Sequence, residues 1–241
     1  MMDFFLFLHK FEASFFIHII TLNYFKMKKI QLFFVLSSFF VSMSVENVYS
    51  STIVTESELL TDTTLSEISK GYSHVGWVGY KIGGKHNGKI EVSKGQLRFV
   101  DGTILDGTFE LDITTLSNED LKDEGANSKL VTHLKSADFF NAEKFPKATF
   151  KIEKAIKYGL VGENKTKYKI KGPLTIKGIT KTISFEADVF EYETSYSISG
   201  ILKIDRSDFD IRYGSGTFFG DIGDKVIYDD VKLNISLVAL K

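Results

Sequence analysis

Apolar and polar residues alternate with a period of two over most of the chain from Tyr72 onward. In one clear segment, Phe109, Leu111 and Ile113 alternate with charged or hydroxyl residues, which is typical of a half-buried strand. A further segment opens at Trp77. The same pattern recurs at Leu97/Phe99, Ala148/Phe150/Ile152, Tyr168/Ile170/Leu174/Ile176, Ile183/Phe185/Ala187/Val189, Ile198/Leu202/Ile204 and Val231/Leu233/Ile235/Leu237. The pattern therefore predicts about eight strands.

Turn-forming dipeptides separate the first of these segments. Asn87-Gly88 predicts a hairpin, and Asp101-Gly102 and Asp106-Gly107 predict the turns that follow. Short connections of this kind join antiparallel neighbours. The sequence therefore predicts an all-β protein, an antiparallel eight-stranded barrel, because closing the sheet removes its unpaired edges.

The alternation is interrupted once, between Ser117 and Ser136. Leu130 and Leu134 stand four residues apart there, which places them on one face of a helix. We therefore expect a short helical insertion in the barrel.

The stretch from Leu134 to Phe150 follows this helix and is rich in phenylalanine. Phe139 and Phe140 are adjacent, and Pro146 biases the residue before it away from helix. Neighbouring side chains of an extended backbone point in opposite directions, so at least one of the two phenylalanines should be buried. We expect this stretch to fold under one end of the barrel as a plug.

The first 70 residues predict an export signal and a linker. Lys28 and Lys29 precede an apolar run from Ile30 to Val45, and small residues end at Ser50, as in a secretory signal peptide. We assign residues 1–26 to a misassigned upstream start, 27–50 to the signal peptide, 51–70 to a linker and 71–241 to the barrel domain. The mature protein is then periplasmic or secreted, with no stable membrane span.

The amino-acid composition excludes several classes of function. The 30 Lys plus Arg balance 31 Asp plus Glu, which argues against nucleic acid as a partner. Cysteine is absent, which excludes a thiol nucleophile and a bacterial lipoprotein anchor. The 22 phenylalanines and 10 tyrosines suit strands around an apolar interior.

Four blocks of the sequence resemble the YceI family of polyisoprenoid-binding, lipocalin-like proteins. They are His133–Phe140 (HLKSADFF), Phe145–Phe150 (FPKATF), Gly172–Thr180 (GPLTIKGIT) and Ile204–Phe209 (IDRSDF), and they occur in that order within residues 72–240. The resemblance implies a secreted or periplasmic lipocalin-like barrel that binds an isoprenoid or similar amphiphilic lipid in its cavity. It implies neither catalysis nor a cofactor.

The inward-facing residues are the candidate ligand site. Alternation alone favours a filled core, whereas the resemblance favours a lined tunnel, in which Gly172 and Gly200 leave space. The candidate lining residues are Trp77, Phe109, Leu111, Ile113, Leu134, Phe139, Phe140, Phe150, Ile152, Ile170, Leu174, Phe185, Leu202 and Phe209. His133, Arg206 and Tyr213 are the candidates for binding a lipid head group.

Two alternative functions remain open at this point. A fatty-acid or fatty-amide carrier would use the same tunnel, and a hydrolase would use Asp205 and Asp208 as paired acids. We expect Arg206 instead to form a fork-like pair with a nearby carboxylate. The histidines lack the spacing of a metal site, and the sequence leaves a homodimer open.

Overall fold

The computed structural model describes residues 63–220 and 223–241, so the predicted signal peptide lies outside the described residues. Within these ranges the chain forms ten strands, one α-helix and three short 3-10 turns. The strands are β1 (Thr63–Ile68), β2 (His74–Lys81), β3 (Gly84–Val100), β4 (Thr103–Asn118), β5 (Lys147–Ile152), β6 (Lys154–Leu160), β7 (Lys165–Ile176), β8 (Ile179–Glu191), β9 (Ser195–Asp205) and β10 (Ile227–Leu240). The helix is α2 (Glu124–Lys135), and the turns are η1 (Lys70–Tyr72), η2 (Arg206–Phe209) and η3 (Gly223–Lys225).

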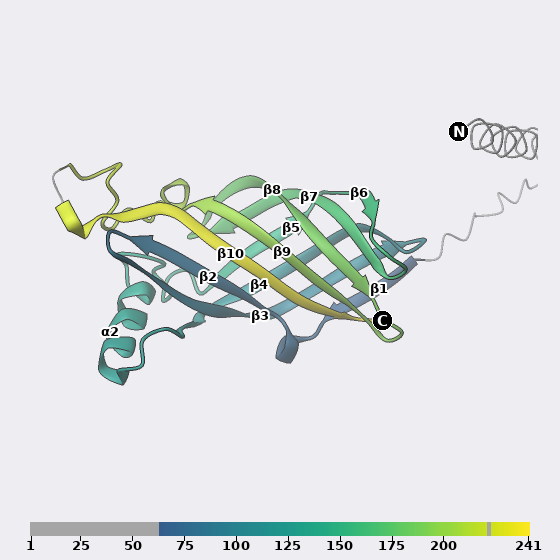
Figure 1. Ribbon diagram of the computed structural model, residues 1–241, viewed down its shortest axis with the longest axis horizontal. Coiled ribbons are helices and arrows are strands. Elements are labelled where there is room, and N and C mark those ends of the chain that lie inside the picture. The colour runs from purple at the N-terminus through teal and green to yellow at the C-terminus, as the bar shows by residue number, and fades with distance from the viewer. Residues whose placement is uncertain (1–62, 221–222) are drawn as a thin grey trace, which may run out of the picture. The chain divides into compact units, whose positions relative to one another are not determined.

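The strands form one closed antiparallel barrel of eight strand positions (Figure 1). The order β10-β2-β3-β4-β5-β7-β8-β9 closes because β9 also pairs with β10. β1 pairs with β3 and β10 beyond the end of β2, and β6 pairs with β7 beyond the end of β5. Each therefore extends an existing position, and the predicted eight-stranded barrel is confirmed.

The side chains alternate across the barrel wall as the sequence predicts. In β7, Tyr168, Ile170 and Leu174 are buried, whereas Lys169 and Lys171 between them are exposed. Burying one large aliphatic side chain stabilises a fold by roughly 1.5–3 kcal/mol. The inward set thus supplies the driving force for closing the barrel.

Two of the predicted turns are wrong. Asn87 and Gly88 lie inside β3, and the β2–β3 hairpin turns at Ile82-Gly83, where Gly83 has φ +77°. A Cβ on Gly88 would lie 1.8 Å from the carbonyl oxygen of Ser117. This glycine therefore allows two backbones to approach closely rather than turning the chain.

Asp106-Gly107, the second wrong turn, lies inside β4, where Asp106 forms an ion pair with Arg98 on β3. A Cβ on Gly107 would lie 2.6 Å from a methyl carbon of Leu97, so close packing requires this glycine as well. The third prediction is confirmed, because Asp101 and Gly102 both have positive φ between β3 and β4.

The predicted linker ends earlier than residue 70, because Thr63–Ile68 forms β1. In this strand Ser66 points inward and is fully buried, whereas Leu65 is 56% exposed. A polar residue faces inward and an apolar one outward, so the alternation in the sequence did not predict this strand.

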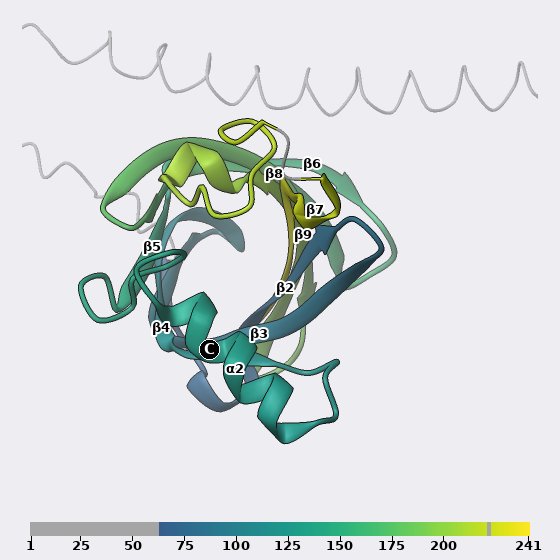
Figure 2. The same ribbon diagram turned by 90° about the vertical axis from the view of Figure 1, so that its left-hand side faces the viewer.

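Helix α2 and the stretch after it lie at one end of the barrel (Figure 2). The carboxylate of Asp123 accepts a hydrogen bond from the N–H of Ala126 and caps the first turn. After the helix, the N–H of Phe140 donates to the carbonyl of Leu134 at 3.1 Å, which folds the chain back. Phe139 is 7% exposed, so the prediction of a buried phenylalanine is confirmed. In residues 63–220 and 223–241, no helix combines the length and apolar character needed to cross a bilayer.

Candidate functional site

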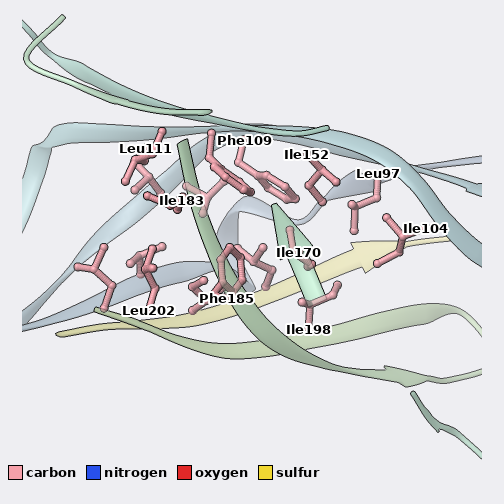
Figure 3. A pocket seen from close by; sticks show the side chains of 17 residues that line it. Leu97, Ile104, Phe109, Leu111, Ile152, Ile170, Ile183, Phe185, Ile198 and Leu202 are labelled. Carbon is pink, nitrogen blue, oxygen red and sulfur yellow. The ribbon is translucent and has the colours of Figure 1, made fainter. Parts of the chain in front are cut away.

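The lumen of the barrel contains an inner cavity whose walls are apolar atoms (Figure 3). The space open to the centre of a water-sized sphere is about 80 Å³. All eight strand positions contribute to its lining, which is Val75, Val92, Leu97, Ile104, Phe109, Leu111, Phe150, Ile152, Ile170, Leu174, Ile183, Phe185, Ile198, Leu202, Leu233, Ile235 and Leu237. An apolar cavity of this kind offers water no hydrogen-bond partner.

An outer cavity adjoins the inner one toward α2. Its volume by the same measure is about 150 Å³, and its surface is also apolar. Its lining is Val75, Trp77, Gly79, Tyr80, Lys81, His86, Ile90, Leu111, Ile113, Leu116, Leu130, Leu134, Phe139, Phe140, Ala148, Leu174, Ile176, Ile204, Arg206, Ile211, Ile227, Tyr228, Val231 and Leu233. Val75, Leu111, Leu174 and Leu233 line both cavities, so the two cavities are direct neighbours along the barrel.

Three phenylalanines lie together in the wall of the inner cavity (Figure 3). The ring centroids of Phe109 and Phe150 are 6.4 Å apart, and those of Phe150 and Phe185 are 5.7 Å apart. All three are half-buried even though they point into the lumen. All three border the inner cavity, so this part of the lumen is lined rather than completely filled.

The outer cavity reaches exposed residues at Tyr80, Lys81 and Tyr228, which with His86 define its mouth. Tyr80 is 38% and Tyr228 50% exposed. The register between β2 and β10 shifts between Ile227 and Val231, so three residues of β10 oppose Tyr80 alone. The extra residues form a bulge, which interrupts pairing at this seam of the barrel.

A polar network orients His86 at the mouth. Its Nδ1 lies 2.8 Å from Oδ2 of Asp120, and the other carboxylate oxygen accepts from the N–H of Asn87 and the amide of Asn118. Burial opposes ionisation of Asp120, but these hydrogen bonds outweigh it and hold the pKa of this carboxyl below its ordinary value. A carboxylate partner keeps the proton on Nδ1, which leaves Nε2 of His86 available at the mouth.

Two of the three predicted head-group residues, His133 and Tyr213, lie outside both cavities. Nε2 of His133 is 3.1 Å from Asp138, and its ring contacts the rings of Phe139 and Tyr213 edge-on, at 5.0 and 4.5 Å. Neither His133 nor Tyr213 belongs to the lining of either cavity. Together with Phe139 they hold α2 and the β9–β10 connection against each other.

Arg206 lines the outer cavity, but its guanidinium is committed to the protein. Nη1 donates to the carbonyl of Ile211, Nη2 to that of Ile227 and Nε to that of Tyr228. Nη2 also lies 3.0 Å from Oδ1 of Asp229, so Arg206 does pair with a carboxylate, but through a single contact rather than the expected fork. Burial lowers the pKa of Arg206, and Asp229 opposes this shift. The residue fastens η2 to the start of β10.

Thirteen of the fourteen candidate lining residues lie in one or both linings. Phe209, the exception, is 1% exposed in the core at η2 and belongs to neither lining. Gly172 does not leave space in the tunnel as expected, because a Cβ there would lie 1.8 Å from the carbonyl oxygen of Lys151. At Gly200 a Cβ would meet Glu186 at 2.9 Å, so close approach explains this glycine too.

The polar residues of the mouth were missed by the sequence reasoning. Lys81 and Tyr80 sit at the end of β2, and His86 faces Gly79 across the hairpin. The inward parity that includes Val75 and Trp77 continues to Gly79 and Lys81, so it could have identified Lys81.

The paired acids expected of a hydrolase do not face each other in a shared polar site. Asp205 accepts from the N–H of Ser207 and caps η2, and Asp208 pairs with Lys181 at 3.0 Å. Neither belongs to a cavity lining. Among the described residues, no three His, Asp or Glu side chains gather in a metal-binding group.

Fold and lumen together define an antiparallel β-barrel with an internal apolar cavity. The chain belongs to the YceI family, since the YceI-like domain matches residues 61–239. The predicted family and fold class are thereby confirmed.

Relatives and solved structures agree with this assignment. The chain is 31% identical over 117 residues to a UPF0312 protein of Photorhabdus laumondii, covering 45% of this chain and about half (53%) of that protein. It is 28% identical over 157 residues to a UPF0312 protein of Vibrio parahaemolyticus, covering 62% and 74%.

Two solved structures share the fold. BcnA of Burkholderia cenocepacia has a TM-score of 0.55 at 25% identity, covering 71% of this chain and 98% of that one. A polyisoprenoid-binding domain from Saccharophagus degradans, implicated in plant cell wall breakdown, has a TM-score of 0.52 at 14% identity, covering 73% and 97%.

Proposed function

We propose that this protein binds a long-chain isoprenoid lipid in the lumen of its barrel and carries or sequesters it without chemical change. The observation that carries the proposal is the pair of adjoining apolar cavities, the outer of which reaches exposed residues at the mouth. A slender chain can lie along such a pair of cavities, and each buried methylene contributes about 0.8 kcal/mol.

Membership of the YceI family and the shared fold of a polyisoprenoid-binding domain support an isoprenoid as the ligand. A role in binding rather than catalysis is supported by the separate structural contacts of Asp205 and Asp208. A fatty acid or fatty amide is the second candidate, since an apolar lumen also accommodates a straight chain.

The polar head of the lipid would rest at the mouth. Lys81 offers an ammonium group, His86 offers Nε2, and Tyr80 and Tyr228 offer hydroxyl groups there. These residues replace His133, Arg206 and Tyr213 in the proposal, because those three side chains contact other parts of the protein.

We further propose that the protein acts in the periplasm or outside the cell. The support is the sequence alone: Lys28-Lys29, the apolar run to Val45 and the small residues ending at Ser50.

Native mass spectrometry of protein purified without detergent tests the function. We expect a complex heavier than the polypeptide by the mass of a polyprenyl or quinone-like lipid, identified after solvent extraction. A fatty-acid or fatty-amide mass would support the second candidate. Protein that is lipid-free and takes up neither class when supplied would overturn both.

A matched pair of variants locates the lipid. A Cβ on Gly79, in the mouth, or on Gly71, in η1, meets nothing within 4 Å, and neither glycine has a positive φ. Gly79→Leu should fill the mouth and lower lipid occupancy, whereas Gly71→Leu should leave occupancy unchanged.

A further inference from the structure

The inner cavity ends next to aromatic side chains on three of its strands. Along each strand, the next inward residue beyond the last lining residue is aromatic. The pairs are Leu97 and Phe99 on β3, Ile170 and Tyr168 on β7, and Ile198 and Tyr196 on β9. Inward residues of a strand are spaced by about 7 Å, so three rings enter the lumen one step past the cavity. We call Phe99, Tyr168 and Tyr196 the aromatic floor.

The rings of the aromatic floor have room because small residues lie opposite two of them. Tyr168 pairs with Ala187 on β8, and Tyr196 pairs with Ala239 on β10. The rings of Phe99 and Tyr196 are stacked with their centroids 4.1 Å apart. Their exposures are 2% for Phe99, 1% for Tyr168 and 6% for Tyr196, so the rings close this end of the lumen.

Polar contacts hold the aromatic floor in place. The hydroxyl of Tyr168 lies near the backbone of Ile104 and the side chain of Thr103, next to the β3–β4 turn. The ring of Tyr196 lies under Nζ of Lys241 at 4.7 Å, and Lys241 in turn pairs with Glu191 at 2.8 Å. Ring stacking, burial and the cation over Tyr196 restrict the rings, so the floor is a firm stop rather than a loosely packed end.

We propose that the aromatic floor sets the length of lipid tail that the protein buries, with the tail entering first through the mouth. This inference rests on the proposed function. A tail shorter than the distance from mouth to floor leaves part of the lumen empty, and a longer one leaves its polar end and some methylenes in water.

The energetics predict a distinctive dependence on length. Each added methylene that is buried tightens binding about fourfold, whereas one that stays in water adds nothing. Affinity should therefore rise steeply along a series of prenyl alcohols and then become constant. The length at which it becomes constant marks the depth of the floor.

The experiment measures dissociation constants for all-trans prenyl alcohols from two to nine isoprene units. Trp77, the single tryptophan of the chain, lines the outer cavity, and its fluorescence provides the signal. Phe99→Leu lowers the floor, so the chain length at which affinity becomes constant should increase by at least one isoprene unit. Ile198→Phe raises the floor by one inward residue, so that chain length should decrease by at least one isoprene unit.

Phe209→Leu is the matched control, because Phe209 is as buried as Phe99 but lies outside both linings. Its affinity should become constant at the wild-type chain length. The inference is overturned if affinity becomes constant at the wild-type chain length in both Phe99→Leu and Ile198→Phe. If only one of these variants folds, the same result in that variant overturns it. If the wild type binds none of the alcohols, the proposed function itself has failed.

Discussion

At the scale of single residues, the open end of the barrel depends on side chains that hold other side chains in place. Asp120 accepts hydrogen bonds from Asn87 and Asn118 and pairs with His86, while Phe139 closes the space under α2. The contribution of Asp120 is electrostatic and depends on pH, whereas that of Phe139 comes from burial and depends on the size of the side chain.

Asp120→Asn should make the protein less sensitive to acid. The folded pKa of Asp120 lies below its ordinary value of 3.8, so its stabilising contribution is present above that value. It is lost as the pH falls through the lowered folded pKa. Urea unfolding followed from pH 7 to pH 2 should show a smaller loss of stability in Asp120→Asn than in the wild type. Parallel pH profiles would contradict the assignment.

Phe139→Ala should lower the free energy of unfolding by about 3–5 kcal/mol, because it removes a buried ring and leaves a void. Phe140→Ala should cost less, since Phe140 is only half-buried. Thermal and denaturant unfolding of the lipid-free proteins provide the measurement. An unchanged melting temperature in both variants would mean that this stretch does not close the barrel.

The head-group residues show what residue-level sequence reasoning can miss. His133, Arg206 and Tyr213 are polar residues near the predicted open end, but their partners come from other elements: Tyr213 contacts His133, and Arg206 pairs with Asp229. Whether a polar group is free for a ligand depends on such contacts between distant segments. The apolar lining was easier, because the period of two directly reports which face is inward.

At the scale of elements, the strands with clear alternation were predicted and the irregular ones were not. β6 was missed because it exposes apolar residues, including Ile156 and Leu160, and contains Gly159 at an irregularity in its pairing with β7. β1 was missed because Ser66 is its inward residue. Both elements extend positions of the barrel, so eight positions could be predicted without them.

Gly172→Ala tests the close approach of β7 to the junction of β5 and β6. The added Cβ would lie 1.8 Å from the carbonyl oxygen of Lys151, so the backbone must move and the barrel should be strongly destabilised. Gly79→Ala is the matched strand control, because its Cβ meets nothing within 4 Å, and it should be neutral or slightly stabilising. Equal melting temperatures for the two variants would contradict the argument.

At the scale of the whole molecule, the barrel is an apolar container with different ends. The aromatic floor closes one end, and the mouth lies at the other. Helix α2 and the β9–β10 connection are found at the end with the mouth (Figures 1 and 2). The sequence predicted the inward-facing residues of the strands and the stretch after the helix that folds under one end. It could not predict the depth of the cavity, because depth depends on which inward residues of different strands share a level.

The proposed location outside the cytoplasm makes a prediction about the N-terminus. N-terminal sequencing of the exported protein should begin close to Ser51, and Lys28→Glu combined with Lys29→Glu should reduce export. A membrane-bound form that retains residues 1–26 would contradict the assignment of an upstream start and a cleaved signal.

The central claim is that the lumen holds the lipid, and lipid occupancy of charged variants tests it most directly. Phe150→Asp and Phe185→Asp place a carboxylate in the inner cavity, where desolvation costs several kcal/mol or raises the pKa of the new side chain. Thr149→Asp and Ser184→Asp add the same charge at the exposed neighbouring positions. Phe150→Leu and Phe185→Leu keep the lumen apolar.

The measurement is solvent extraction and mass spectrometry of bound lipid from each folded variant. The account predicts that the two inward aspartate variants lose the lipid, while the outward aspartate and the leucine variants retain it. Full lipid occupancy in folded Phe150→Asp and Phe185→Asp would contradict the account and place the ligand elsewhere on the protein.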